Sequence, residues 1–257
     1  MSWKITGGSI PGSDHVGVTS TVYKNNQDAF FTHIDEEMAI GIVADGCSSG
    51  VHSEVGSKMG VSLLGELIKN SFERSFAIGN TSIDWTRLQV TFLSQLSVIA
   101  NSMGNSLSKV VEEYFLFTIV GFVITQYGVV IFNCGDGVYS VDGKINSFGP
   151  FPNNEPPYFS YGILGKKVCN FNILPYPIGY GDLTSIVIGS DGVELISELP
   201  EKLEKWFSME KMFSNSDLLR RQLSIMNKPF KNENGAFVPG PLKDDVTLII
   251  AINDKGF

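Results

Sequence analysis

The sequence has little basic charge for its length. Its 257 residues include 19 Lys and Arg against 27 Asp and Glu, so the formal net charge is −8. This balance argues against a general nucleic-acid binder, whose surface would be basic. Charged residues make up only 18% of the chain and hydrophobic residues 43%. We therefore expect a globular protein with a sizeable core and not a disordered chain.

Cysteine is also scarce. The three cysteines, Cys47, Cys134 and Cys169, are widely spaced and form no Cys-x-x-Cys pair. This argues against a zinc site or a disulfide framework and fits a reducing, cytoplasmic compartment.

Long apolar runs are missing as well. The first residues contain no basic region followed by an apolar stretch, so we expect no signal peptide. The one segment to test as a membrane span, residues 115–132, is interrupted by the polar residues of 125–128. A hairpin of two buried strands is the better interpretation, and we expect no contact with a membrane.

The hydrophobic pattern predicts a single α+β domain over residues 1–257. The predicted elements follow the order strands, two helices, strands, a helix and a final strand, which is not a series of βαβ units. We expect β-prone stretches within 3–32, strands at 38–44, 114–125, 128–133, 138–141, 144–148, 185–189 and 246–252, helices at 53–70, 84–109 and 201–226, and loops at 71–82, 149–161 and 227–242.

Several of the apolar strands carry an aspartate at one end. These residues are Asp28, Asp45, Asp136, Asp191 and the pair Asp244-Asp245. A sheet can bring strand ends together at one edge, and hard cations such as Mg²⁺ and Mn²⁺ prefer carboxylate and carbonyl oxygens. A single Asp-Gly is most simply a turn, as we expect for Asp142-Gly143. Four or five such aspartates indicate a metal site, because without a cation their mutual repulsion is costly.

Five motifs resemble the metal-dependent Ser/Thr protein phosphatases of the PP2C type. They are NNQDAF (25–30), VADGCSSG (43–50), NCGDGV (133–138), IGSDGV (188–193) and KDDVTLI (243–249). They occur in the family's order and span nearly the whole chain. GGSIPGSDH and SEVGS are most similar to the compact bacterial branch. The resemblance implies a four-layer α/β/β/α sandwich of two antiparallel sheets flanked by helix pairs.

The resemblance also implies roles for the aspartates at two Mg²⁺ or Mn²⁺ ions and at a third, weaker site. Asp45 would bridge the two ions and Asp244 is preferred over Asp245 as a ligand, because its register matches the family motif. The implied metal-associated set is Asp28 (through the metals' water shell), Asp45, Gly46 (by its carbonyl), Asp136 (third metal), Asp191 and Asp244.

The implied reaction is hydrolysis of phosphoserine and phosphothreonine by a hydroxide that bridges the metals and is positioned by Asp45. Cys47 need not act as a nucleophile, because no Cys-x5-Arg signature follows it. The implied partners are phosphoproteins, including those of a Ser/Thr kinase.

The chain departs from the family pattern around the phosphate. Tyr23 stands where the family usually carries an arginine, and Lys24 or His15 can substitute or can be surface residues. Cys47 stands where eukaryotic members carry a histidine. His52 lies nearby and can act as the general acid or be an ordinary exposed residue. The alternatives to a protein phosphatase are a phosphatase-like binding or sensing module with weak turnover and a metal hydrolase of small phosphoesters.

Overall fold

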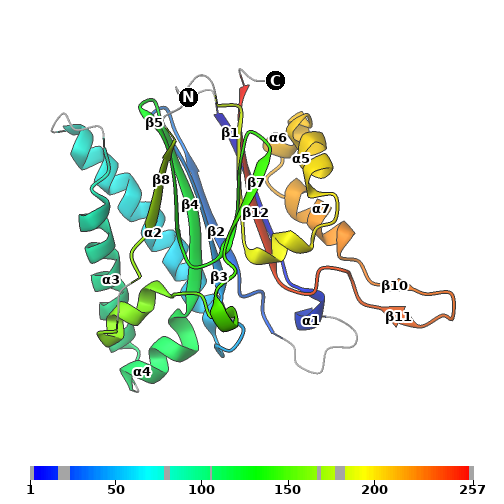
Figure 1. The fold of residues 1–257 in the computed structure, drawn as a ribbon, viewed down its shortest axis with the longest axis horizontal. Coiled ribbons are helices and arrows are strands. Elements are labelled where there is room, and N and C mark those ends of the chain that lie inside the picture. The colour runs from blue at the N-terminus through cyan, green and yellow to red at the C-terminus, as the bar shows by residue number, and fades with distance from the viewer. Residues whose placement is uncertain are drawn as a thin grey trace.

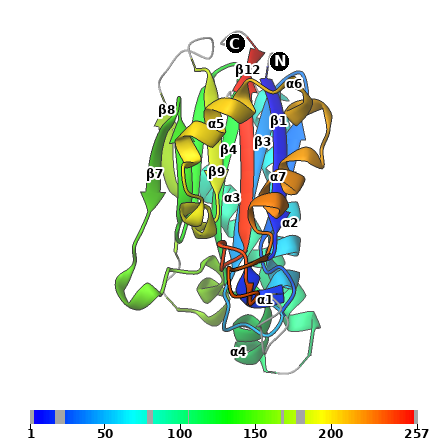
Figure 2. The same ribbon diagram turned by 90° about the vertical axis from the view of Figure 1, so that its right-hand side faces the viewer.

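The computed structural model describes residues 3–16, 24–77, 82–104, 106–166, 169–176 and 183–254. Two five-stranded antiparallel sheets pack face to face, and helices cover the outer face of each (Figures 1 and 2). The first sheet has the order β2 (Ala29–Ile34), β3 (Met38–Gly46), β4 (Phe117–Thr125), β5 (Gly128–Cys134) and β8 (Asn172–Tyr176). The second has the order β1 (Trp3–Ile10), β12 (Val246–Asn253), β9 (Ser185–Gly189), β6 (Gly137–Val141) and β7 (Lys144–Phe148).

The helices fall into two groups, one on each sheet. The long helices α2 (Ser53–Ala77) and α3 (Trp85–Ser102) cover the first sheet, and α5 (Leu199–Phe207), α6 (Glu210–Ser214) and α7 (Leu218–Met226) cover the second. This is the predicted α+β four-layer sandwich. The remaining elements are α1 (Ser13–Val16), α4 (Leu107–Val110), the π-helical turn η1 (Val111–Phe115), the 3-10 turns η2 (Pro152–Asn154), η3 (Phe159–Leu164) and η4 (Asp191–Leu195), and the small hairpin β10 (Phe230–Lys231) and β11 (Phe237–Val238).

The central strands are apolar throughout because both of their faces are buried. In β3, Val43 faces the other sheet while Ile40 and Ile42 face the helices, as the two-residue period of a strand requires. Gly41 of the same strand has no room for a side chain, since an added Cβ would lie 2.5 Å from the Phe122 ring. Apolar side chains form three layers, one between the two sheets and one between each sheet and its helices. These layers hold the sheets in a fixed position relative to each other, and this position determines where the strand ends meet.

The predicted ends of the first two helices were partly wrong. Residues 71–77, expected in a loop, continue α2, because buried Phe72 extends the stripe of Leu64 and Ile68 by one more turn. The predicted helix 84–109 is instead two helices, α3 and α4, which are separated around Gly104. This glycine has a φ of +74°, a backbone conformation that ends helices.

Three other expectations also need correction. The predicted helix 201–226 is three short helices, interrupted near Ser208 and by the polar run at 214–217. Residues 114–115 belong to η1 and not to β4, and the loop 227–242 contains the β10–β11 hairpin. Strand β8 was missed because it is half exposed and contains Pro175, so it shows no clear alternation. Across the described residues, we find no helix with both the length and the apolarity to cross a membrane.

Candidate metal centre

An acidic pocket lies where the ends of several strands meet at one edge of the sandwich. Its volume is about 100 Å³. The predicted residues among those that line it are Asp45, Gly46, Asp136, Asp191 and Asp244, and the others are Cys47, Ser48, Thr118, Pro156 and Tyr158. We call this the acidic pocket.

The strand register explains why these aspartates come together. Gly189 at the end of β9 pairs with both Val138 of β6 and Leu248 of β12. Asp191 therefore follows β9 at the same edge at which Asp136 precedes β6 and Asp244 precedes β12. Asp45 reaches this edge from the facing sheet, where it pairs with Thr118 of β4.

The carboxylates of the acidic pocket repel one another. Burial, followed by the charges of Asp28 and Asp191, raises the pKa of Asp45 well above its usual range. Burial and the charge of Asp191 raise the pKa of Asp136 to about 6, and the same two causes raise the pKa of Asp244. Within the described part of the chain, no Lys, Arg or His lines the pocket to offset this charge.

The donor set fits a hard divalent cation that retains water ligands. All of the predicted ligands offer oxygen atoms, and the buried Oδ1 of Asp191 has no hydrogen-bond partner among the described residues. In those same residues, no three His, Cys, Asp or Glu side chains are grouped so that they alone could hold an ion. Mg²⁺ is usually bound through one or two carboxylates and several waters, so it does not require such a closed group.

The glycine of the Asp45-Gly46 turn is required by its surroundings. A Cβ on Gly46 would lie 2.6 Å from the carbonyl oxygen of Gln27 and 2.9 Å from the Ser53 hydroxyl. The Ser53 hydroxyl in turn donates to the Cys47 carbonyl at 2.9 Å. These contacts hold the turn against the start of α2.

Asp28 lies beside the acidic pocket but does not line it. Its Oδ2 accepts a hydrogen bond of 2.7 Å from the Ser190 hydroxyl, while its buried Oδ1 has no partner among the described residues. Burial, and then the charge of Asp245, raise the pKa of Asp28 to about 8. Asp28 is therefore close enough to influence Asp45 electrostatically without reaching the pocket wall.

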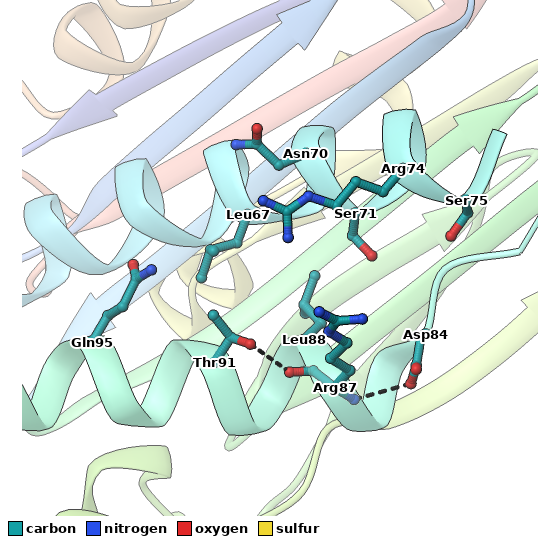
Figure 3. A pocket seen from close by; sticks show the side chains of 10 residues that line it. All are labelled: Leu67, Asn70, Ser71, Arg74, Ser75, Asp84, Arg87, Leu88, Thr91 and Gln95. Carbon is teal, nitrogen blue, oxygen red and sulfur yellow. Dashed lines mark hydrogen bonds between the residues drawn. The ribbon is translucent and has the colours of Figure 1, made fainter. Parts of the chain in front are cut away.

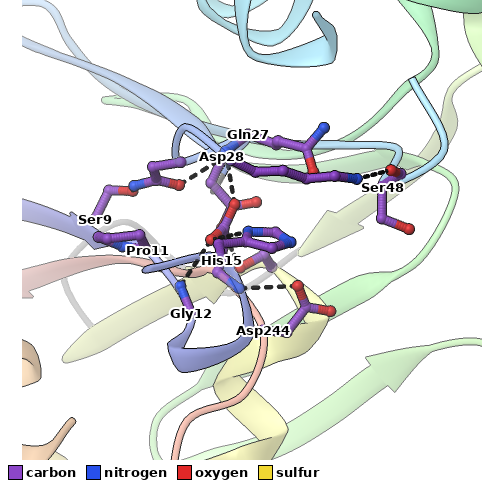
Figure 4. A network of polar contacts seen from close by, with 12 residues as sticks. Ser9, Pro11, Gly12, His15, Gln27, Asp28, Ser48 and Asp244 are labelled. Carbon is purple, nitrogen blue, oxygen red and sulfur yellow. Dashed lines mark hydrogen bonds and ion pairs between the residues drawn. The ribbon is translucent and has the colours of Figure 1, made fainter. Parts of the chain in front are cut away.

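Asp244 and Asp245 have different environments although they are adjacent. Asp244 lines the acidic pocket. Asp245 is 3% exposed, and its carboxylate accepts hydrogen bonds from the backbone N–H groups of Gly12 at 2.7 Å and Gln27 at 2.6 Å. Figure 4 shows Gly12, His15 and Gln27 gathered in this network. His15 Nδ1 lies 2.8 Å from the same carboxylate. The geometry thus leaves Asp244 as the carboxylate available to a ligand.

The structure does not bring the predicted phosphate-binding and acid residues to the wall of the pocket. His15 contacts Asp245, and this hydrogen bond raises its pKa. Lys24 Nζ donates to the carbonyl oxygen of Ser48. His52 has a side chain that is 48% exposed, and its ring lies 5.0 Å from that of Tyr114. Tyr23 lies outside the described residues.

Tyr158 is the main pocket residue that sequence reasoning missed. It comes from the proline-rich loop before η3, is 8% exposed and lies within hydrogen-bonding reach of Cys47. Burial, and then this contact, raise the pKa of its phenol, which therefore stays protonated and can donate a hydrogen bond. The sequence indicates only that this loop borders the site. Which of its residues points inward depends on how the loop packs.

One comparison with known proteins identifies the family. The family model for protein phosphatase 2C matches residues 21–229, which include Asp28, Asp45, Asp136 and Asp191. A search of the curated proteins gave no match.

Several solved structures share the fold over nearly their whole length. A bacterial serine phosphatase is 17% identical, with a TM-score of 0.62 and coverage of 97% of each chain. The Ser/Thr phosphatase Stp1 from Staphylococcus aureus is 16% identical, with a TM-score of 0.58 and coverage of 98% of this chain and 95% of that one. RsbX in complex with magnesium is 16% identical, with a TM-score of 0.51 and coverage of 97% of this chain and 94% of that one. From the match over most of its length, the chain belongs to the protein phosphatase 2C family.

Proposed function

We propose that the chain is a metal-dependent Ser/Thr protein phosphatase that acts on phosphoproteins in the bacterial cytoplasm. The observation that carries this proposal is the acidic pocket, in which four aspartates meet without a basic side chain among the described residues that line it. Such a pocket is costly without cations and would repel a phosphate group until cations are bound. The family membership supports the same function.

We assign the metal-binding role to the residues of that pocket. Asp45 and the Gly46 carbonyl would hold one of two Mg²⁺ or Mn²⁺ ions, and Asp45 with Asp191 and Asp244 the other. Asp136 would serve a third, weaker site and Asp28 would orient metal-bound water. The chemistry that bound cations supply is activation of water as a nucleophile and neutralisation of charge on the phosphoryl oxygens.

The side chains of the pocket bind and orient the substrate. The Tyr158 phenol, the Ser48 hydroxyl and the Thr118 hydroxyl are neutral donors at the pocket wall. We propose that Tyr158 donates to a phosphoryl oxygen, in the place of the family's arginine. Cys47 need not attack phosphorus, because the nucleophile in this proposal is water; its thiol contacts the Ser49 hydroxyl at 3.1 Å and Tyr158.

The test is release of phosphate from a phosphothreonine peptide with added Mn²⁺, compared with release from a small aryl phosphate. We expect Mn²⁺-dependent turnover with preference for the peptide. Asp45→Asn should lower turnover by more than about 100-fold, since even loss of an outer-shell contact costs 10- to 100-fold.

Asp142→Asn is the matched control. Asp142 also precedes a glycine, but it lies in the β6–β7 turn and accepts hydrogen bonds from Thr184 and Ser185, away from the acidic pocket. Its replacement should leave turnover unchanged. Wild-type turnover in Asp45→Asn would contradict the metal mechanism.

A binding or sensing module is the second candidate. The observation that favours it is the absence of Lys, Arg and His from the part of the pocket wall that is described. This function predicts saturable binding of the phosphopeptide in the presence of Mn²⁺ without release of phosphate.

A further inference from the structure

A second cavity opens between α2 and α3, far from the acidic pocket (Figure 3). Its volume is about 360 Å³, within the range of about 300–1,000 Å³ that is typical of small-molecule sites. Its α2 residues begin at Leu67, 14 residues after Ser53, which corresponds to about 20 Å along the helix. The residues that line it are Leu67, Asn70, Ser71, Arg74, Ser75, Asp84, Arg87, Leu88, Thr91 and Gln95.

Two of the four arginines in the whole sequence face this cavity. Arg74 extends from α2 and Arg87 from α3, and both side chains reach into the space between the helices (Figure 3). The structure gives neither guanidinium an ion pair or a hydrogen bond with another described residue. By contrast, Arg220 and Arg221 both bind Asp217, at 2.6 and 2.5 Å.

Asp84 is the one acidic residue among the described residues that line the cavity, and it is already engaged. The Asp84 side chain caps α3 by accepting a hydrogen bond of 3.0 Å from the backbone N–H of Arg87. Because the cavity carries two cationic groups and one carboxylate, it keeps an excess of positive charge. An anion between the helices would remove the repulsion between the two guanidinium groups.

A buried hydroxyl adds a third donor. Ser75 is only 9% exposed, lines the cavity and makes no hydrogen bond to another described residue through its side chain. The hydroxyl of Thr91 is different, since it donates to the Arg87 carbonyl at 2.8 Å. Arg74, Arg87 and Ser75 are therefore among the available donors.

We propose that this cavity binds the phosphate group of a small phosphorylated molecule of about mononucleotide size. A phosphate dianion matches two guanidinium forks, which can share its three terminal oxygens. Leu67 and Leu88 provide apolar surface for the organic part of the ligand. The proposal does not depend on phosphatase activity, because no residue of this cavity belongs to the acidic pocket.

The test is isothermal titration of the full chain with AMP, inorganic phosphate and adenosine. No divalent cation is added, so that the acidic pocket repels anions. We expect saturable binding of AMP, weaker binding of phosphate and no binding of adenosine. Arg74→Gln and Arg87→Gln should each weaken AMP binding by roughly tenfold, the effect of losing a charge-assisted hydrogen bond. Arg74→Lys, which keeps the charge but not the fork, should weaken it less.

Arg220→Gln is the matched control, since it removes the same charge from another helix. It should leave AMP binding unchanged, and circular dichroism should show that all four variants fold. The proposal is overturned if AMP does not bind saturably, if the control weakens binding as much as the cavity variants do, or if phosphate and AMP bind equally well. The absence of AMP binding would leave the proposed phosphatase activity untouched, and the absence of phosphatase activity would leave the proposed AMP site untouched. The two proposals are therefore tested independently.

Discussion

The acidic pocket and the polar network beside it use the same kind of residue in opposite ways. In the network, the Asp245 carboxylate accepts two backbone hydrogen bonds and contacts His15. In the pocket, Asp45 and Asp244 face other carboxylates and their pKa values are raised. Asp245 joins the segment after the first strand to the start of the last one. The pocket aspartates instead face other carboxylates, although Asp244 accepts one hydrogen bond of 2.9 Å from the backbone N–H of Asp245.

This difference separates carboxylates that stabilise the fold from those that are available to a ligand. A buried charge that has its hydrogen bonds contributes to folding, and its loss leaves donors without partners. A buried charge that faces like charges costs stability, and that cost is offset only when a cation binds.

The largest expected effect is on the free energy of unfolding of Asp245→Ala. This change leaves the N–H groups of Gly12 and Gln27 without their acceptor, and should lower that free energy by about 3–5 kcal/mol. Urea denaturation measures it. The adjacent Asp244→Ala is the control and should change stability by less than about 1 kcal/mol. Equal losses in the two variants would contradict the distinction.

The second effect is on the affinity for Mn²⁺. Without a cation, the raised pKa of about 8 keeps a proton on Asp28 at neutral pH, whereas the pKa of about 6 keeps one on Asp136 only at more acidic pH. Cation binding should displace at least one proton, so that affinity increases by roughly tenfold per pH unit between pH 6 and 7. Titration calorimetry in buffers of different ionisation enthalpy measures this release, and an affinity independent of pH would argue against it.

The third effect is a gain of stability in Asp45→Asn. The folded-state pKa of Asp45 lies above its ordinary value of 3.8, so its ionisation costs stability increasingly as the pH rises past 3.8. Without divalent cations at pH 8, the variant should therefore be more stable than the wild type by about 1 kcal/mol. Thermal unfolding at pH 5 and pH 8 tests this, and the gain should be smaller at pH 5. A variant less stable than the wild type at pH 8 would show that Asp45 supports the fold.

The smallest effect concerns His15. Its pKa is raised above 6.5 by Asp245, so the stabilisation is complete below pH 6.5 and is lost as the pH rises through the folded-state value. The difference in stability between the wild type and His15→Gln should shrink by up to about 1 kcal/mol from pH 6 to pH 9. His33→Gln, which removes a contact with the more exposed Asp35, is the matched control. A difference that does not depend on pH would mean that His15 acts only through packing.

The sequence predicts the parts of the molecule that depend on local pattern. Continuous apolar runs locate β3, β9 and β12, and the aspartates at their ends meet because antiparallel strands share an edge. The choice of Asp244 over Asp245 as a metal ligand rests on the family motif and stays a prediction. In the structure Asp244 lines the acidic pocket, and Asp245 accepts backbone hydrogen bonds from Gly12 and Gln27.

The rest depends on tertiary packing. The inward position of Tyr158 results from how a proline-rich loop folds over Cys47. The end of α2 depends on burial of Phe72 against the core, and the division of 201–226 into three helices on packing against the second sheet. The cavity between α2 and α3 depends on how these two helices pack against each other. The sequence therefore gives no signal that Arg74 and Arg87 face the same cavity.

The most direct test of the central claim is the number of Mn²⁺ ions bound by the wild type, Asp45→Asn and Asp142→Asn, measured by titration calorimetry at pH 7.5. We predict two saturable sites in the wild type and in Asp142→Asn, and the loss of at least one of them in Asp45→Asn. No saturable binding in the wild type, or the same binding in all three proteins, would contradict a metal centre in the acidic pocket.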